Sequence, residues 1–195
     1  MDGRASAALI GGVTLLERAV GYTLGSLQLI TPQRLARPTP CQGWTLSQLL
    51  RHMQGSLDAL LEAVELGHVA LDPALPDVSA DPVAALRERA CQLVGAWTSG
   101  RAAEVISIGG CPITASITAT AGALEIAVHG WDVGRACGKD RPIPEALAEE
   151  LLRLSPMFVT AADRPVRFAA PVPVAGSATT SDQLVSFLGR RPAYG

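Results

Sequence analysis

Basic residues are not in excess in this sequence. Its 16 lysines and arginines are outnumbered by 18 aspartates and glutamates, which gives a formal net charge of −2. Binding to a nucleic-acid backbone needs a surface rich in lysine and arginine. The composition therefore gives no support to nucleic-acid binding.

The sequence also lacks a long, uninterrupted apolar run. No such run reaches the ~20 residues that a helix needs to cross a bilayer. The N-terminal segment contains the charged residues Glu17 and Arg18, and it lacks the basic start, apolar core and cleavage site of a signal peptide. We therefore expect no membrane partner and a cytoplasmic location.

Cysteine is sparse, and none of the four cysteines falls in a C-x-x-C pair. Zinc ribbons and thioredoxin-type redox sites need such pairs, so neither is supported. In a reducing cytoplasm we expect four free thiols. The four residues are Cys41, Cys91, Cys111 and Cys137.

Apolar residues are abundant, at 48% of the chain, and they recur every three or four positions along four long segments. This periodicity predicts amphipathic helices that each bury one face. Thr45 is suited to cap the second helix, and Ser79 or Asp81 the third. The predicted long helices span residues 5–29, 45–66, 82–100 and 116–137, and shorter ones span residues 144–154 and 181–192.

The segments between these helices are rich in proline, glycine and β-branched residues. Residues 31–44 and 71–82 are predicted to be irregular connections. Residues 104–115 contain a Gly-Gly pair between β-branched residues, which indicates a short hairpin or an extended crossover. Residues 164–180 are predicted to form an extended strap.

Together these elements predict an all-α protein. A four-helix bundle is expected over residues 1–160. Residues 161–195 are expected to add the strap and a short helix that pack on the bundle, as part of a single domain.

An otherwise apolar stretch, ALEIAVHGWD (residues 123–132), carries three ionisable side chains. Glu125 and His129 are four positions apart, so both lie on one face of the predicted helix, and Asp132 lies on the same shoulder. A carboxylate and an imidazole at that spacing can bind one divalent metal ion, but the same pair also occurs on solvated helix faces. Because apolar residues flank this polar stripe on both sides, it is better suited to lining a cavity than to facing bulk water.

A metal site also needs a ligand from another helix. The sequence has three histidines, and His52 lies at the edge of the apolar face of the second predicted helix. It could be a metal ligand or a packed, hydrogen-bonded residue. His68 lies at a helix end, where a cationic ring favours the helix dipole, and we assign it no role in a site.

Two motifs resemble a known family. RPTPCQGWTLSQLLRHM (residues 37–53) is similar to a signature of the DinB-like superfamily, in the branch typified by mycothiol-dependent maleylpyruvate isomerase. There, a T-P-C-x-x-W loop leads into a helix that bears a histidine. EIAVHGWDVGRACG (residues 125–138) resembles the E-x-x-x-H-G-W-D signature of the same branch, and the ending DQLVSFLGRRP resembles a shorter actinobacterial subgroup known only as metal-binding.

The resemblance implies a DinB-like four-helix bundle with a metal triad of His52, Glu125 and His129. Two imidazoles and one carboxylate suit zinc best, with nickel, iron and manganese as alternatives. The resemblance further implies that the metal activates a low-molecular-weight thiol, mycothiol in actinobacteria, for S-transfer to or isomerisation of a small electrophilic substrate. The isomerase has an additional C-terminal domain where this sequence has a short segment, so we leave the electrophile open.

Two other functions are compatible with the same ligands. A metal-bound water could act in a hydrolase. A bundle that binds a metal or a metabolite without turnover would also use these residues. We favour an enzyme, a metal-dependent thiol transferase or isomerase, and an apolar helix face could in addition support a homodimer.

Five further residues are weaker candidates. Asp132 could take part in catalysis or orient a metal ligand. Cys41 precedes a helix, whose dipole can lower a thiol pKa, so it is either a nucleophile or a small packed residue. Trp44, Trp131 and Arg190 are candidates for substrate binding, and each could equally serve packing or surface contacts.

Overall fold

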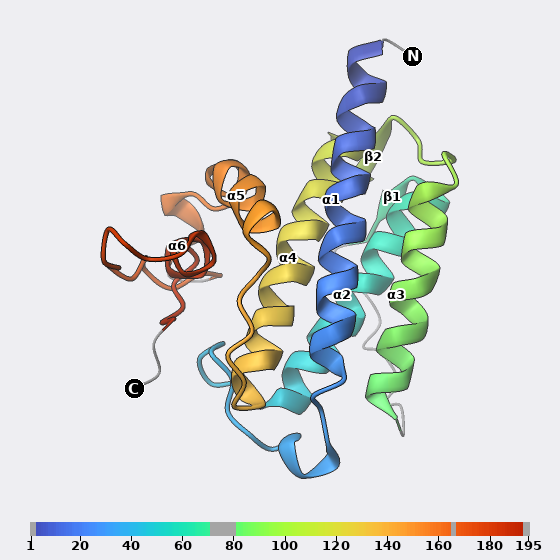
Figure 1. The fold of residues 1–195 in the computed structure, drawn as a ribbon. Coiled ribbons are helices and arrows are strands. Elements are labelled where there is room, and N and C mark those ends of the chain that lie inside the picture. The colour runs from blue at the N-terminus through green and yellow to red at the C-terminus, as the bar shows by residue number, and fades with distance from the viewer. Residues whose placement is uncertain (1–2, 71–80, 165–166, 193–195) are drawn as a thin grey trace.

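The computed structural model describes residues 3–70, 81–164 and 167–192, and these residues are mostly helical. Four long helices form a bundle (Figure 1). In this bundle α1 packs mainly on α4 and α3, and α2 packs mainly on the same two helices. This arrangement confirms the predicted all-α fold of the DinB-like type. The helices are α1 (Gly3–Leu27), α2 (Leu46–Leu66), α3 (Pro82–Thr98) and α4 (Ala115–Ala136).

Capping side chains set where the second and third helices begin. The Thr45 side chain accepts a hydrogen bond from the backbone N–H of Gln48, and the Gln48 side chain accepts one from the backbone N–H of Thr45. The Asp81 carboxylate accepts hydrogen bonds from the first turn of α3, where Pro82 occupies the first position. The alternative cap, Ser79, and most of the predicted connection 71–82 lie outside the described residues.

A small sheet lies at one end of the bundle. Strand β2 (Val105–Ile108) pairs antiparallel with β3 (Cys111–Thr114) and parallel with the two-residue β1 (His68–Val69). Gly109 and Gly110 join β2 to β3 with φ angles of 56° and 84°. A two-residue turn of this kind needs positive φ at both positions, which glycine adopts without strain. Of the two predicted alternatives for this segment, the hairpin is therefore the one that forms.

Helix α4 is the central element of the protein. Sixteen of its 22 residues are buried. It approaches α1 closely because Gly130 has no side chain: a Cβ there would lie 2.4 Å from Oγ1 of Thr23, whose hydroxyl donates to the carbonyl of Ile126 at 2.8 Å. His129 and Asp132 of α4 are consequently held inside the bundle.

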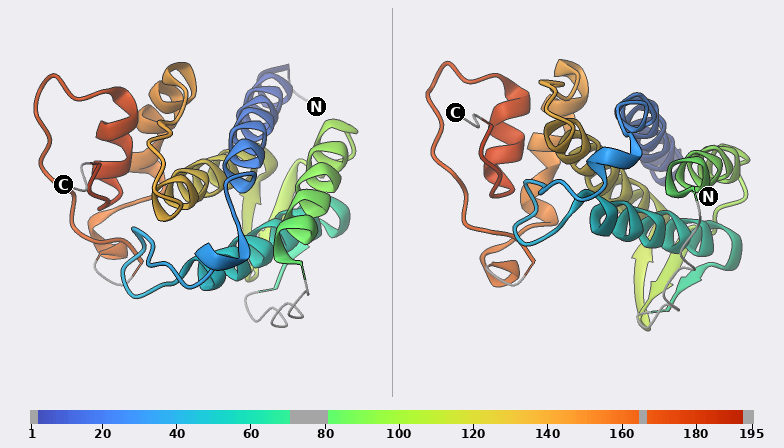
Figure 2. Two further views of the ribbon diagram at one scale, coloured as in Figure 1. Left: turned by 60° about the horizontal axis from the view of Figure 1, so that its bottom comes forward. Right: turned by 90° about the horizontal axis from the view of Figure 1, so that it is seen from below.

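The C-terminal residues form a second layer beside α4 (Figures 1 and 2). There α5 (Glu145–Leu154) packs on α6 (Thr180–Phe187), and the backbone N–H of Ile143 donates to Oγ of Ser181 at 2.9 Å. Residues 167–179 form neither helix nor strand and loop around α6, as expected for the predicted strap. Three short 3-10 helices complete the described chain: Pro32–Arg34, Ser155–Met157 and Ala161–Asp163.

The last helix is shorter than predicted. It ends at Phe187 rather than continuing to residue 192. Gly189 adopts a left-handed conformation with φ of 83°, and the backbone N–H of Arg190 turns back to the carbonyl of Val185 at 2.9 Å. This reversal directs the Arg190 side chain towards the bundle.

The four cysteines are free thiols, as predicted. Within the described part of the chain, one helix segment, Ala7–Leu27 of α1, is long and apolar enough to cross a membrane by length and composition. The core helix of a bundle meets the same criterion, and α1 packs on α3 and α4. The cytoplasmic location stays a prediction.

Candidate metal centre

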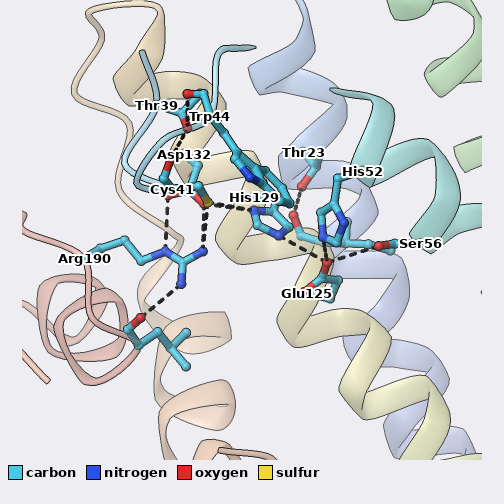
Figure 3. Close-up of polar contacts among 12 residues, drawn as sticks. Thr23, Thr39, Cys41, Trp44, His52, Ser56, Glu125, His129, Asp132 and Arg190 are labelled. Carbon is cyan, nitrogen blue, oxygen red and sulfur yellow. Dashed lines mark hydrogen bonds and ion pairs between the residues drawn. The ribbon is translucent and has the colours of Figure 1, made fainter. Parts of the chain in front are cut away.

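Three predicted ligands converge between α2 and α4. Oε1 of Glu125 lies 2.6 Å from Nε2 of His52 and 3.1 Å from Nε2 of His129 (Figure 3). One ligand atom from each of the three residues lies within 4.8 Å of the others. The two imidazole rings meet edge to face, with centroids 5.0 Å apart. The structure therefore brings His52 to Glu125, which lies 73 positions further along the sequence, and to His129 one turn beyond it.

Helix α2 supplies a second contact to the same carboxylate. Oγ of Ser56 donates to Oε1 of Glu125 at 3.1 Å. Ser56 lies four residues after His52, so both side chains project from one face of α2 towards α4. Ser56 was not among the residues predicted from the sequence, although its helical spacing from His52 could have identified it.

The other ring nitrogen of His129 is held by Asp132. Nδ1 of His129 lies 2.9 Å from Oδ2 of Asp132, one turn further along α4. A carboxylate on Nδ1 selects the tautomer that leaves Nε2 free to bind a metal, an arrangement that is frequent around metal-binding histidines. Of the two roles considered for Asp132, the geometry fits that of orienting a ligand.

Asp132 in turn pairs with the C-terminal segment. Nη2 of Arg190 donates to Oδ2 of Asp132 at 3.0 Å and contacts Sγ of Cys41 at 3.3 Å. The Cys41 thiol donates to Asp132 at 3.2 Å. Arg190 is thus part of a buried ion pair, and the sequence offered no spacing that could predict a partner 58 residues away.

Electrostatics in this cluster follow from burial and close charges. Burial raises the pKa of the Asp132 carboxyl, but the Arg190 guanidinium and the His129 hydrogen bond outweigh this effect and bring the pKa to about 2. Burial likewise raises the pKa of Glu125, and the charge and hydrogen bonds of His129 and His52 hold it well below its ordinary value.

The pKa of His129 is shifted in the opposite direction, upwards. Burial lowers the pKa of its ring, but the charge of Glu125 and the hydrogen bonds with Asp132 and Cys41 raise it well above the ordinary value. In the protein without metal, a protonated His129 therefore balances the two carboxylates on either side of it.

The His52, Glu125 and His129 set fits a divalent ion by its donor chemistry. Two atoms that each lie about 2.1 Å from one zinc ion in tetrahedral geometry are about 3.4 Å apart. The separations of 2.6 and 3.1 Å between these side chains are within about 1 Å of that spacing. One carboxylate and two imidazoles would also leave positions for exogenous ligands.

A second group of possible ligands, Cys41, His129 and Asp132, fits a cation less well. The Arg190 guanidinium already contacts both the Cys41 thiol and the Asp132 carboxylate. A divalent ion placed there would face a fixed positive charge at close range. The ligand group that is compatible with a metal is therefore the one on the Glu125 side of His129.

The two tryptophans proposed for substrate binding have different surroundings. The Trp44 ring packs edge-on against His52 with centroids 5.0 Å apart and is 37% exposed, so it borders the centre. Trp131 is buried in the core with the Arg135 guanidinium over its ring. His68, in β1, lies 3.7 Å from Glu62 and outside the centre.

A narrow pocket opens next to the same three-ligand set. All four bundle helices line it, and Glu125 and His129 are among its lining residues. Its remaining walls are mainly aliphatic. Two of the three residues of the polar stripe, Glu125 and His129, thus line a cavity, as the apolar flanks predicted.

These features define a DinB-like helix bundle with a candidate metal centre between its second and fourth helices. The chain belongs to the mycothiol maleylpyruvate isomerase N-terminal domain family, whose model matches residues 16–134. The match spans the bundle from α1 to α4, including all three candidate ligands, and supports a mycothiol-related, metal-binding function. The layer formed by α5 and α6 lies beyond it.

Two relatives extend the similarity into this layer. They are uncharacterized proteins of Mycobacterium tuberculosis, from strains CDC 1551 / Oshkosh and ATCC 25618 / H37Rv. Each is 26% identical to this chain over 182 residues, which cover 89% of the chain and 94% of the relative. No solved structure matches the chain.

Proposed function

We propose that this protein is a divalent-metal-dependent enzyme that activates a low-molecular-weight thiol of the mycothiol type. The thiol would attack a small electrophilic substrate, with S-transfer or isomerisation as the outcome. The observation that carries the proposal is the convergence of His52, Glu125 and His129, with Asp132 on the far nitrogen of His129. These three residues would hold the ion, with zinc as the first candidate and nickel, iron or manganese as alternatives.

A bound divalent ion would lower the pKa of a coordinated thiol, so that the thiol is presented as a thiolate at neutral pH. The residues of the chain prepare the site for this chemistry. Asp132 fixes the ring of His129, and Arg190 keeps Asp132 ionised. Ser56 holds the Glu125 carboxylate from the side of α2.

The candidate centre is open to solvent on the side of His52 and Glu125. His52 and Glu125 are each about one-third exposed, whereas the side chain of Asp132 is fully buried. The ring of Trp44 lies beside His52, is exposed to a similar degree, and would contact a bound cosubstrate. A water-soluble thiol can therefore reach the ligands while the Asp132 and Arg190 pair remains shielded.

Metal content tests the first half of the proposal. The protein, purified without a metal-affinity tag and reconstituted with divalent ions, is expected to hold one ion per chain, and His52→Ala is expected to lose it. His68→Ala is the matched control, because this histidine lies outside the centre. A wild-type chain that holds no stoichiometric metal under any reconstitution contradicts the proposal.

Thiol consumption tests the second half. With mycothiol and a panel of small electrophiles, the metal-loaded protein is expected to consume thiol, and Glu125→Ala is expected to abolish this activity. Metal binding without turnover would instead favour a non-catalytic binding protein. Turnover that is independent of added thiol would favour a hydrolase that uses a metal-bound water.

A further inference from the structure

His129 belongs to two groups of possible metal ligands, one at each nitrogen of its ring (Figure 3). Glu125 and His52 lie on the Nε2 side, and Asp132 and Cys41 lie on the Nδ1 side. A thiolate, a carboxylate and an imidazole on the Nδ1 side form a donor set that zinc binds readily. A divalent ion therefore has two overlapping places to bind.

The distances between the side chains do not favour the Glu125 side. Sγ of Cys41 lies 3.2 Å from Oδ2 of Asp132 and 3.8 Å from Nδ1 of His129, and the latter two atoms are 2.9 Å apart. Two ligand atoms on one tetrahedral zinc ion are about 3.4 Å apart, or about 3.6 Å where one of them is sulfur. Each separation on the Nδ1 side is within about 0.5 Å of this spacing. Charge, rather than spacing, must therefore decide between the two sides.

Arg190 supplies a fixed positive charge on the Nδ1 side. Its Nη2 lies 3.3 Å from Sγ of Cys41 and 3.0 Å from Oδ2 of Asp132, so one nitrogen contacts two of the three possible ligands. A guanidinium keeps its proton throughout the physiological pH range. Its side chain is only 11% exposed, so solvent and salt screen its repulsion of a second cation only weakly.

The end of α6 holds this guanidinium in place. Nη1 of Arg190 donates to the carbonyl of Leu188 at 3.0 Å, and the left-handed conformation of Gly189 turns the chain back towards the bundle. The charge thus comes from the C-terminal layer, which lies beyond the part of the chain that matches the family. An ion could take its place on the Nδ1 side only if Arg190 left both Asp132 and Cys41.

We propose that Arg190 selects the side of His129 on which the metal binds. Its guanidinium excludes the ion from Cys41 and Asp132 and leaves it to the ligands on the Glu125 side. This inference rests on the proposed function and deepens it, because it names the residue that controls the ligand set.

The selection has a consequence for the proposed chemistry. A divalent ion held by a thiolate and a carboxylate has no net charge, whereas one held by a single carboxylate keeps a net positive charge. That positive charge is what lowers the pKa of a coordinated thiol from solution. Arg190 therefore keeps the thiol of the chain, Cys41, off the ion and leaves the open positions to the cosubstrate.

Cobalt(II) distinguishes the two sides, because a thiolate bound to cobalt gives a strong sulfur-to-cobalt charge-transfer band in the near ultraviolet. When Cys41 binds the ion, its proton passes to the buffer and its sulfur becomes a ligand. With one equivalent of cobalt, the wild-type protein is expected to bind the ion without this band, and Arg190→Gln is expected to show it. Adding Cys41→Ser to Arg190→Gln is expected to remove the band, which assigns the sulfur.

The His52→Ala background isolates the Nδ1 side, since it removes a ligand from the Glu125 side only. His52→Ala alone is expected to hold no cobalt. Adding Arg190→Gln is expected to restore one cobalt ion per chain together with the thiolate band. A folded His52→Ala and Arg190→Gln double variant that binds no cobalt overturns the proposal.

Two further variants test whether the charge itself is responsible. Arg190→Lys keeps a cation that can pair with Asp132 and is expected to show no thiolate band. Arg191→Gln removes a charge from the exposed neighbouring position and is also expected to show none. A band in Arg190→Lys as strong as that in Arg190→Gln would mean that the charge is not what excludes the ion, and it overturns the proposal.

Loss of Arg190 leaves the buried Asp132 without its cation, so folding of each variant is followed by circular dichroism with and without cobalt. If Arg190→Gln is unfolded alone, cobalt is expected to restore the helical signal together with the thiolate band, because the ion replaces the missing charge. Arg190→Met, which fills similar space without a charge, is the second variant and is expected to behave alike. Helical protein without the band in both variants overturns the proposal.

The outcome is separable from that of the proposed function. A wild-type protein that binds cobalt without a thiolate band, together with Arg190 variants that also lack it, overturns the selection by Arg190 and leaves the metal-dependent function intact. A thiolate band in the wild-type protein overturns the selection directly. A wild-type protein that binds no metal, while Arg190→Gln binds cobalt through Cys41, supports exclusion by Arg190 and overturns the proposed function.

Discussion

Oδ2 of Asp132 lies 2.9 Å from Nδ1 of His129, and Oε1 of Glu125 lies 3.1 Å from Nε2 of the same ring. Each carboxylate thus holds one nitrogen of a buried imidazole. Because the two nitrogens are engaged by different residues, the ring cannot rotate without losing a contact. Removing the charge of Asp132 should therefore weaken, rather than strengthen, metal binding by His129.

Asp132→Asn is expected to weaken metal binding by about 10- to 100-fold, since the amide keeps the shape but not the charge that orients His129. Competition with a chelator of known affinity measures the change. Asp140→Asn is the control, because Asp140 is exposed and pairs with Arg135 at the surface. Equal affinities for the wild-type and Asp132→Asn proteins would contradict an orienting role.

Metal affinity is expected to rise with pH. The pKa of His129 is raised in the protein without metal, so the ion must displace a proton from this ring below that pKa. The stabilisation that protonated His129 gives to the metal-free protein is present at low pH and is lost as the pH rises through its folded-state pKa. Calorimetric titration in two buffers with different ionisation enthalpies measures the released proton, and a buffer-independent heat would exclude this linkage.

Cys41→Ser is expected to leave the metal stoichiometry unchanged. The serine hydroxyl can still donate to Asp132, and the candidate centre does not include Cys41. Elemental analysis of the purified variant measures the number of metal ions per chain. If the variant loses its metal, the centre is the group of Cys41, His129 and Asp132, and the assignment made from the position of Arg190 is wrong.

Arg190→Ala is expected to destabilise the protein by about 3 kcal/mol, because it leaves the buried Asp132 carboxylate without its guanidinium partner. Chemical denaturation near neutral pH measures the loss. The difference should shrink as the pH falls towards the Asp132 pKa of about 2, where the carboxylate itself is neutralised. Arg191→Ala, at an exposed neighbouring position, should have little effect.

Gly130→Ala is expected to destabilise the bundle by about 1–3 kcal/mol, because the added methyl group would lie within 2.4 Å of Thr23 and separate α4 from α1. Gly95→Ala in α3 meets no neighbour within 4 Å and is expected to stabilise its helix by about 0.5–1 kcal/mol. Thermal unfolding of both variants provides the comparison. A neutral Gly130→Ala would show that the two helices can move apart without cost.

Local signals in the sequence were sufficient to predict the helices and to place two of the three candidate ligands on one helix face. The capping pattern at Thr45 placed the start of α2, and the four-residue spacing put Glu125 and His129 on one face of α4. The end of α6 was misjudged because the reversal at Gly189 depends on a backbone conformation that periodicity does not reveal. The apolar residues on both sides of the polar stripe were enough to predict that Glu125 and His129 line a cavity.

Contacts between distant parts of the chain could not be predicted from such local signals. Nothing in the spacing of residues along the chain says that His52 would contact Glu125, or that Arg190 would lie on Asp132 and Cys41. The resemblance of two motifs to a known family anticipated the first contact, and no motif anticipated the second.

Helical periodicity is a local property, so the chain alone settles which side chains share a face of α4 and that this face is too apolar to lie in water. Which residues of other elements contact that face depends on how closely the helices can approach one another. Gly130 lets α4 approach α1, α2 brings His52 and Ser56 to Glu125, and the turn after α6 delivers Arg190 to the opposite side of His129. Burial then converts these contacts into large shifts in pKa, because charges removed from water must be balanced by their neighbours.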